Sequence, residues 1–141
     1  MPENRIDLMN YRLESSQEKL EIAKLLLDAG HYKDSISRSY YALFAAVRAL
    51  LALDGKDFSK HAGVIAYFQK EYIKTGRLNT KFSKYLSGAF RIRSNVDYAD
   101  FYVVSVKDAQ EQYDRAVEMC EAIREYLRNR LEEKRNGGEE T

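Results

Sequence analysis

Apolar residues recur at spacings of three and four along most of the chain, which is the period of an amphipathic α-helix. A helix with this pattern buries one face against its neighbours and leaves the other face to water. The pattern therefore predicts an all-α protein. The clearest stripe belongs to a first helix predicted over residues 7–29 and comprises Met9, Leu13, Ser16, Leu20, Ala23 and Leu27.

Four more helices are predicted, over residues 34–53, 59–74 and 80–94 and from Ser105 to about residue 131. Asp34 is the expected N-cap of the second helix, and Ser105 is the expected N-cap of the last. The second helix has the widest apolar surface, which predicts a central position. Because short connections favour antiparallel neighbours, we expect an up-and-down antiparallel bundle of four to five helices.

A single domain is expected over residues 5–131, because a length of 141 residues suits one compact core. Residues 132–141 are charged and contain glycine. We expect a disordered tail there.

The composition excludes several classes of function. The formal net charge is +1, so any attraction to nucleic acid or to a membrane must come from a local patch. Cys120 is the only cysteine, which excludes an intrachain disulfide and a cysteine-based metal site and indicates a reducing compartment. A secretory signal pattern, an apolar run of about 20 residues and the common enzyme motifs are all absent. We therefore expect a cytoplasmic protein with no metal or cofactor.

The densest group of polar and aromatic residues lies over residues 90–102, which include a predicted non-helical connection over residues 95–104. Arg91 and Arg93 near a helix end can hold a phosphate through paired N–H donors. Neighbouring aromatic rings can stack on bases. The alternative is a surface network of Arg and Asp residues, with tyrosine rings that seal the end of the bundle.

A few isolated residues have a chemical and a structural interpretation. His61 lies in the first turn of the third predicted helix, where it can bind an anion or transfer a proton, or simply pack on a neighbour. His31 is expected to be exposed and without a role. Arg38 and Arg48 lie on an apolar helix, so each needs solvent, a carboxylate or a phosphate. Cys120 lies on an apolar stripe and is expected to be inert.

Three ordered segments together resemble a known family. The run SRSYYALFAAVRALL (residues 37–51) resembles the second helix of HEPN domains (higher eukaryotes and prokaryotes nucleotide-binding), and KHAGVI (residues 60–65) follows at a fitting distance. The run RSNVDYADF (residues 93–101) is similar to a small stand-alone prokaryotic branch of that family. The resemblance covers about residues 7–130.

The resemblance implies a homodimeric helical bundle. Many HEPN proteins are metal-independent ribonucleases, often toxins paired with a minimal nucleotidyltransferase antitoxin. Their motif is Arg, four to six residues, then His, supplied by both subunits at the dimer interface. In such a site Arg stabilises charge on the phosphate, and His moves the proton of the attacking 2′-hydroxyl or of the leaving group.

This chain departs from that motif because no His follows Arg91 or Arg93 within reach. If Arg93 is the motif arginine, Tyr98 stands at the first position where the motif places its histidine. If Arg91 is the motif arginine, Val96 stands there. A tyrosine hydroxyl, with an ordinary pKa of about 10, is a poor base at neutral pH. The aspartate at position 97 can accept a proton but is ordinarily too acidic to return it. His61 can substitute only if the fold brings it beside the arginines.

The resemblance implies the following sets of site residues. The catalytic candidates are Arg93, Arg91, Tyr98 and Asp97. The candidates for binding RNA or a nucleotide are Arg91, Arg93, His61 and Tyr102. Tyr98 is also a possible modification site, because in some relatives the nucleotidyltransferase adenylylates a tyrosine near the motif.

Three hypotheses about function remain at the level of sequence. The first is a toxin-like partner of a nucleotidyltransferase, with ribonuclease activity that is weak, altered or lost. The second is a non-catalytic helical module that binds a nucleotide, RNA or a protein. The third is a structural dimer that associates through aromatic faces.

Overall fold

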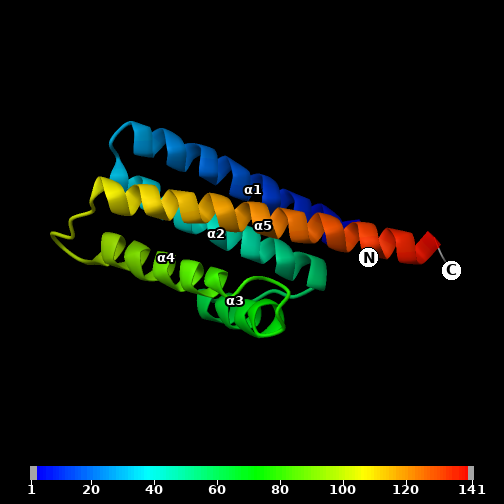
Figure 1. The fold of residues 1–141 in the computed structure, drawn as a ribbon. Helices are drawn as coiled ribbons and strands as arrows, with labels where there is room; N and C mark the ends of the chain where they lie inside the picture. The colour runs from blue at the N-terminus through cyan, green and yellow to red at the C-terminus, as the bar shows by residue number, and fades with distance from the viewer. Residues whose placement is uncertain (1–2, 140–141) are drawn as a thin grey trace.

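The computed structural model describes residues 3–139, and every regular element in that range is helical (Figure 1). The all-α prediction is confirmed. The elements are α1 (Glu3–Asp28), α2 (Tyr32–Asp54), α3 (His61–Phe68), a π-helical segment η1 (Gln69–Ile73), α4 (Lys81–Tyr98) and α5 (Val106–Glu139).

The four long helices alternate in direction, as Figure 1 shows, while the short α3 lies beside α2 and η1 lies beside α4. The predicted up-and-down bundle is therefore confirmed. The helix α2 is central because it packs on α1, α3, α4 and α5. The connection between α4 and α5 lies at one end of the bundle, and the described ends of the chain lie at the other (Figure 1).

The core forms from the predicted apolar stripes. In α1 the stripe is buried at Met9, Ser16, Leu20, Ala23 and Leu27. By length and composition α2 is apolar enough to cross a membrane, but 72% of its apolar window is buried inside the bundle. That burial is what the central helix of a helical bundle requires.

Two helix starts test the expected N-caps. The prediction for Ser105 is confirmed, because its Oγ accepts a 3.0 Å hydrogen bond from the backbone N–H of Asp108. The prediction for Asp34 is wrong. The helix α2 begins at Tyr32, and its N-cap is His31, whose side chain makes no capping bond.

The helix α4 continues to Tyr98, so residues 95–98 are helical where the sequence predicts a non-helical connection. Two interactions support this last turn. Arg93 and Asp97 form an ion pair at a spacing of four residues, and Ile92 and Val96 pack against a small core cluster around Ile36. The true connection therefore spans residues 99–105.

Two other segments differ from the expected helices. Residues 59–74 are predicted as one α-helix, but the α-helix begins at His61 and changes to a π-helix at Gln69. At the other end of the chain, α5 continues as helix to Glu139, whereas the sequence predicts a disordered tail over residues 132–141. The Glu, Lys and Arg residues that follow Leu131 favour helix. Residues 140 and 141 lie outside the described part of the chain.

A polar network joins the end of α2 to α3, η1 and α5. Asp54 accepts hydrogen bonds from the hydroxyls of Tyr67 (3.0 Å) and Tyr72 (2.6 Å). Arg130 lies 2.7 Å from the other Asp54 oxygen and donates to the Tyr72 hydroxyl at 3.0 Å. Burial and the bond to Asp54 raise the pKa of Tyr72. The network satisfies a largely buried carboxylate and, with Tyr67 from α3, holds four segments together: α2, α3, η1 and α5.

Replacing Arg130 with Met should lower the free energy of unfolding by about 2–3 kcal/mol. The loss is below the roughly 3–5 kcal/mol typical of a fully buried pair because solvent reaches part of the Arg130 side chain. Urea denaturation followed by circular dichroism measures the change. Lys24→Met is the control, because it removes an exposed ion pair with Asp28 and a distant contact of 5.9 Å with the Tyr113 ring centre, and it should leave stability near that of the wild type. Equal stability of both variants would show that the Asp54 network contributes little.

Candidate functional site

Arg93 on α4 lies against two tyrosines of α2. Its guanidinium carbon is 5.5 Å from the ring centre of Tyr40 and 5.1 Å from that of Tyr41. Its Nη2 donates a 2.6 Å hydrogen bond to the Tyr41 hydroxyl. Its Nε lies 2.7 Å from Oδ2 of Asp97, in the geometry of an ion pair rather than of an aligned hydrogen bond. The Arg93 side chain is consequently only 14% exposed.

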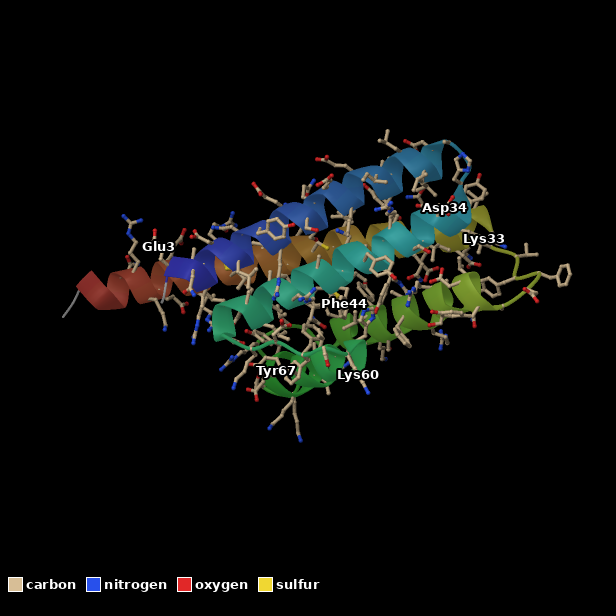
Figure 2. The ribbon with its side chains drawn as sticks, turned by 180° about the vertical axis from the view of Figure 1, so that it is seen from behind. Glu3, Lys33, Asp34, Phe44, Lys60 and Tyr67 are labelled. Atoms are coloured by element: carbon tan, nitrogen blue, oxygen red, sulfur yellow. The ribbon has the colours of Figure 1, made fainter. Side chains whose placement is uncertain are left out.

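His61, the first residue of α3, reaches the same tyrosine. Its Nδ1 shares a 3.1 Å hydrogen bond with the Tyr40 hydroxyl, and its ring centre is 4.1 Å from that of Phe44. Figure 2 labels Phe44 on α2 and Lys60 just before α3, on the side of the bundle where α2 lies next to α3 and α4. The fold therefore brings His61 and Arg93 into contact with one shared ring, that of Tyr40.

The surroundings of His61 favour its neutral form. Burial lowers the pKa of His61, and the positive charges of Arg93 and Arg48 lower it further. Burial raises the pKa of Tyr40 to about 12, so its hydroxyl keeps its proton. Within residues 3–139 the other ring nitrogen of His61, Nε2, makes no hydrogen bond. A neutral imidazole with one nitrogen held and the other available is suited to accept a proton.

The other predicted site residues lie apart from this contact. Arg91 is exposed, and the Tyr98 side chain is 79% exposed. In the described part of the chain, no hydrogen bond or ion pair joins either of them to Arg93 or His61. Tyr102 is half-buried and lines a cavity of about 400 Å³ beside the loop that joins α1 to α2. Asp97 contacts Arg93 directly, and its Oδ1 lies 3.5 Å from the Ser37 hydroxyl.

The connection between α4 and α5 presents apolar side chains to solvent. Phe101 is 98% exposed and Val103 is 84% exposed. Phe101 also has a positive φ of 61°, a backbone conformation that residues other than glycine rarely adopt. Phe90 on α4 is 39% exposed, and its ring makes a T-shaped contact with that of Tyr40, with ring centres 6.0 Å apart.

Sequence reasoning missed the tyrosines that organise the site. Tyr40 and Tyr41 lie on the second predicted helix, and Tyr40 is fully buried. Two adjacent tyrosines on one helix can form cation–π contacts with arginines of another helix. The sequence does not predict these contacts until it is known that the arginine-containing helix α4 packs against α2. The expectation for the two arginines of α2 is confirmed. Arg38 is exposed, and Arg48 lies 3.5 Å from a carboxylate oxygen of Asp57.

Among the described residues no group of three His, Cys, Asp or Glu side chains is placed to hold a metal ion. Cys120 is buried, and its sulfur lies 3.3 Å from the Ser16 hydroxyl oxygen. Burial raises the pKa of Cys120 to about 11, so its thiol stays protonated and unreactive, as predicted.

The arrangement supplies a cation and a neutral base near one another. A guanidinium stabilises charge on a phosphate oxygen, and a neutral imidazole can take a proton from a nearby hydroxyl. An anion that binds Arg93 must compete with Asp97 for the same guanidinium.

Comparisons with known proteins agree on one family. A model described as "HEPN domain" matches residues 9–130. The chain is 33% identical over 120 residues to the "UPF0332 protein" of Thermotoga maritima, an alignment that covers 85% of this chain and 91% of that one. It is also 32% and 26% identical to two proteins of Methanocaldococcus jannaschii, each named "Putative toxin". Those alignments cover 72% and 86% of this chain, and 67% and 87% of the two relatives.

His61 should titrate below the ordinary histidine pKa of about 6.5, and Arg93→Gln should raise its pKa because one nearby positive charge is lost. NMR titration of the imidazole signals in a His31→Gln background measures this pKa without overlap. Arg115→Gln, which removes a guanidinium paired with Glu111 on α5, is the matched control and should change nothing. A His61 pKa unaffected by Arg93→Gln would contradict the proximity of the two charges.

Proposed function

The chain belongs to the HEPN domain family, and on that premise we propose that it is the toxin component of a toxin–antitoxin pair and acts on RNA. The observation that carries the proposal is the contact of Arg93 and His61 with the same residue, Tyr40. Two relatives named "Putative toxin" support the biological role.

The proposed reaction is metal-independent cleavage of a phosphodiester. The 2′-oxygen of one nucleotide bonds to the adjacent phosphorus while the bond from phosphorus to the 5′-oxygen breaks, which leaves a 2′,3′-cyclic phosphate. His61 takes the proton of the attacking hydroxyl, and the departing 5′-oxygen takes a proton from water. Arg93 stabilises the additional negative charge on the phosphate. A general base commonly contributes 10²–10⁴-fold.

The second candidate is a binding module that holds RNA or a nucleotide without cutting it. The observation that favours it is the engagement of Arg93 by Asp97 and Tyr41, which leaves the guanidinium largely covered. In that case the exposed Arg91 supplies the contact to phosphate.

The partners in this proposal are a second copy of the chain and a minimal nucleotidyltransferase antitoxin in the cytoplasm. A homodimer would place two copies of the site near one another, as in other HEPN proteins. Tyr98 is the proposed target of the nucleotidyltransferase. Its 79% exposure at the end of α4 makes the hydroxyl accessible to a second enzyme.

Labelled single-stranded RNA incubated with the protein in the presence of EDTA should be cleaved by the wild type. His61→Gln and Arg93→Gln should each reduce the rate about 10²-fold or more, while Arg115→Gln should retain it. Arg91→Gln distinguishes the contributions of the two arginines. Binding without cleavage would favour the second candidate, and equal cleavage by all variants would exclude this site.

Incubation of the protein with ATP and a cognate nucleotidyltransferase should add an adenylyl group, detected as a mass increase of the intact chain. Tyr98→Phe should abolish the increase because it removes the accepting hydroxyl. Tyr11→Phe is a suitable control, since Tyr11 is 68% exposed on α1, away from the α4–α5 connection. Modification that persists in Tyr98→Phe would assign the target elsewhere.

A further inference from the structure

A second basic cluster lies farther along α2. Arg12 on α1 and Arg48 on α2 both approach Asp57, in the connection between α2 and α3. Nη2 of Arg48 is 3.5 Å from Oδ1 of Asp57, and Nη2 of Arg12 is 4.0 Å from Oδ2. Arg12 Nη1 also donates a 2.8 Å hydrogen bond to the backbone carbonyl of Arg48. Two guanidiniums therefore share one carboxylate.

The cluster has an excess of positive charge. Burial lowers the pKa of Arg12, and the neighbouring charge of Arg48 lowers it further, which Asp57 only partly offsets. The Nε of Arg48 is buried without a hydrogen-bond partner among the described residues. The carboxylate of Asp57 is 63% exposed and makes long contacts to both arginines. An additional or better-placed anion would relieve this repulsion.

This cluster continues the candidate site along one face of α2. Tyr40, Phe44 and Arg48 are spaced by four residues, so they lie on the same face of the helix. Arg93 contacts the first, His61 the second and Asp57 the third. From Tyr40 to Arg48 the helix rises about 12 Å. A stacked strand that rises about 3.4 Å per nucleotide covers this length in three to four nucleotides.

Two half-exposed aromatic rings belong to segments that contact this face, with Phe90 against Tyr40 and Phe58 against Tyr67 of α3. Phe90 is 39% exposed beside Tyr40, and Phe58, which follows Asp57, is 40% exposed. Exposed rings next to guanidiniums favour a ligand that carries both bases and phosphates. An acidic peptide would satisfy the arginines and leave the rings without a matching group.

We infer that Arg12 and Arg48 form a second phosphate subsite for single-stranded RNA, which Asp57 occupies until the RNA backbone displaces it. The inference rests on the proposed function, because it concerns the same RNA strand. The reacting phosphate of that strand binds at Arg93, and another phosphate of its backbone binds at Arg12 and Arg48. Asp57 acts as an internal counterion. Its removal should therefore strengthen RNA binding, whereas removal of Arg48 should weaken it.

Binding is measured by fluorescence anisotropy with a fluorescein-labelled, 2′-O-methylated oligoribonucleotide of about 12 nucleotides. The 2′-O-methyl groups remove the attacking hydroxyls, so binding is observed without cleavage. Asp57→Asn should tighten binding several-fold. Arg48→Gln should weaken it several-fold and reduce the slope of log affinity against log salt by about 0.7, the value for one phosphate contact on a single strand.

Matched controls separate the subsite from the overall charge of the protein. Asp28→Asn removes one carboxylate from the far end of α1, where Asp28 pairs with Lys24. Arg115→Gln removes one guanidinium from α5. Neither should change the affinity appreciably. Circular dichroism and thermal denaturation verify that each variant is folded, and Arg48→Lys should retain part of the binding because it keeps the charge.

Three results would overturn the subsite, and the first two differ in what they say about the proposed function. If Arg93→Gln weakens RNA binding while Arg48→Gln and Asp57→Asn leave it unchanged, the subsite is wrong and the proposed function stands. If the wild type does not bind the oligonucleotide at all, both are wrong. Equal tightening by Asp57→Asn and Asp28→Asn would also overturn the subsite, because the effect would then be one of net charge.

Discussion

The burial of α2 is the constraint on which the rest of the structure depends. Four other helices pack on it, and its core side chains such as Leu43, Val47 and Leu50 are essentially inaccessible to solvent. Full burial of one such side chain contributes about 1.5–3 kcal/mol, so this helix provides much of the driving force for folding. Polar groups nearby must then find partners. The Ser16 hydroxyl donates to the carbonyl of Ala42, and the Ser35 hydroxyl donates to that of Ala23.

The burial of α2 also fixes the positions of the side chains that form the candidate site. Tyr40 is held rigidly because its ring lies in the core, while its hydroxyl remains within reach of His61. A rigid ring positions both Arg93 and His61, which come from helices separated in sequence. Arginine pairs with carboxylates at both ends of this face, Asp97 at one end and Asp57 at the other. These two carboxylates neutralise part of the positive charge that the arginines bring to this face.

Most of the fold was predictable because helical periodicity is a local property. The apolar stripe from Met9 to Leu27 follows from the spacing of its residues. The helix ends at Gly30 and Gly55 follow from the left-handed backbone that glycine readily adopts, with φ values of 85° and 70°. The observed helices differ from the predicted ones where tertiary contacts override the local sequence pattern. Residues 95–98 are helical through packing of Val96 and the pairing of Asp97. The π-helical turn at residues 69–73 brings Tyr72 to Asp54.

The sequence by itself determined the helical class, the family resemblance and the individual residues Arg91, Arg93 and His61 as candidates. It left open whether His61 lies near the arginines, because His61 and Arg93 are 32 positions apart in the chain. The apolar pattern of a helix does not specify which other helix it contacts. Only the tertiary structure decided that Arg93 and His61 meet at Tyr40 while Arg91 and Tyr98 face solvent. The physical reason is that periodicity fixes which face of a helix is buried, whereas the packing of all the helices together fixes which buried faces meet.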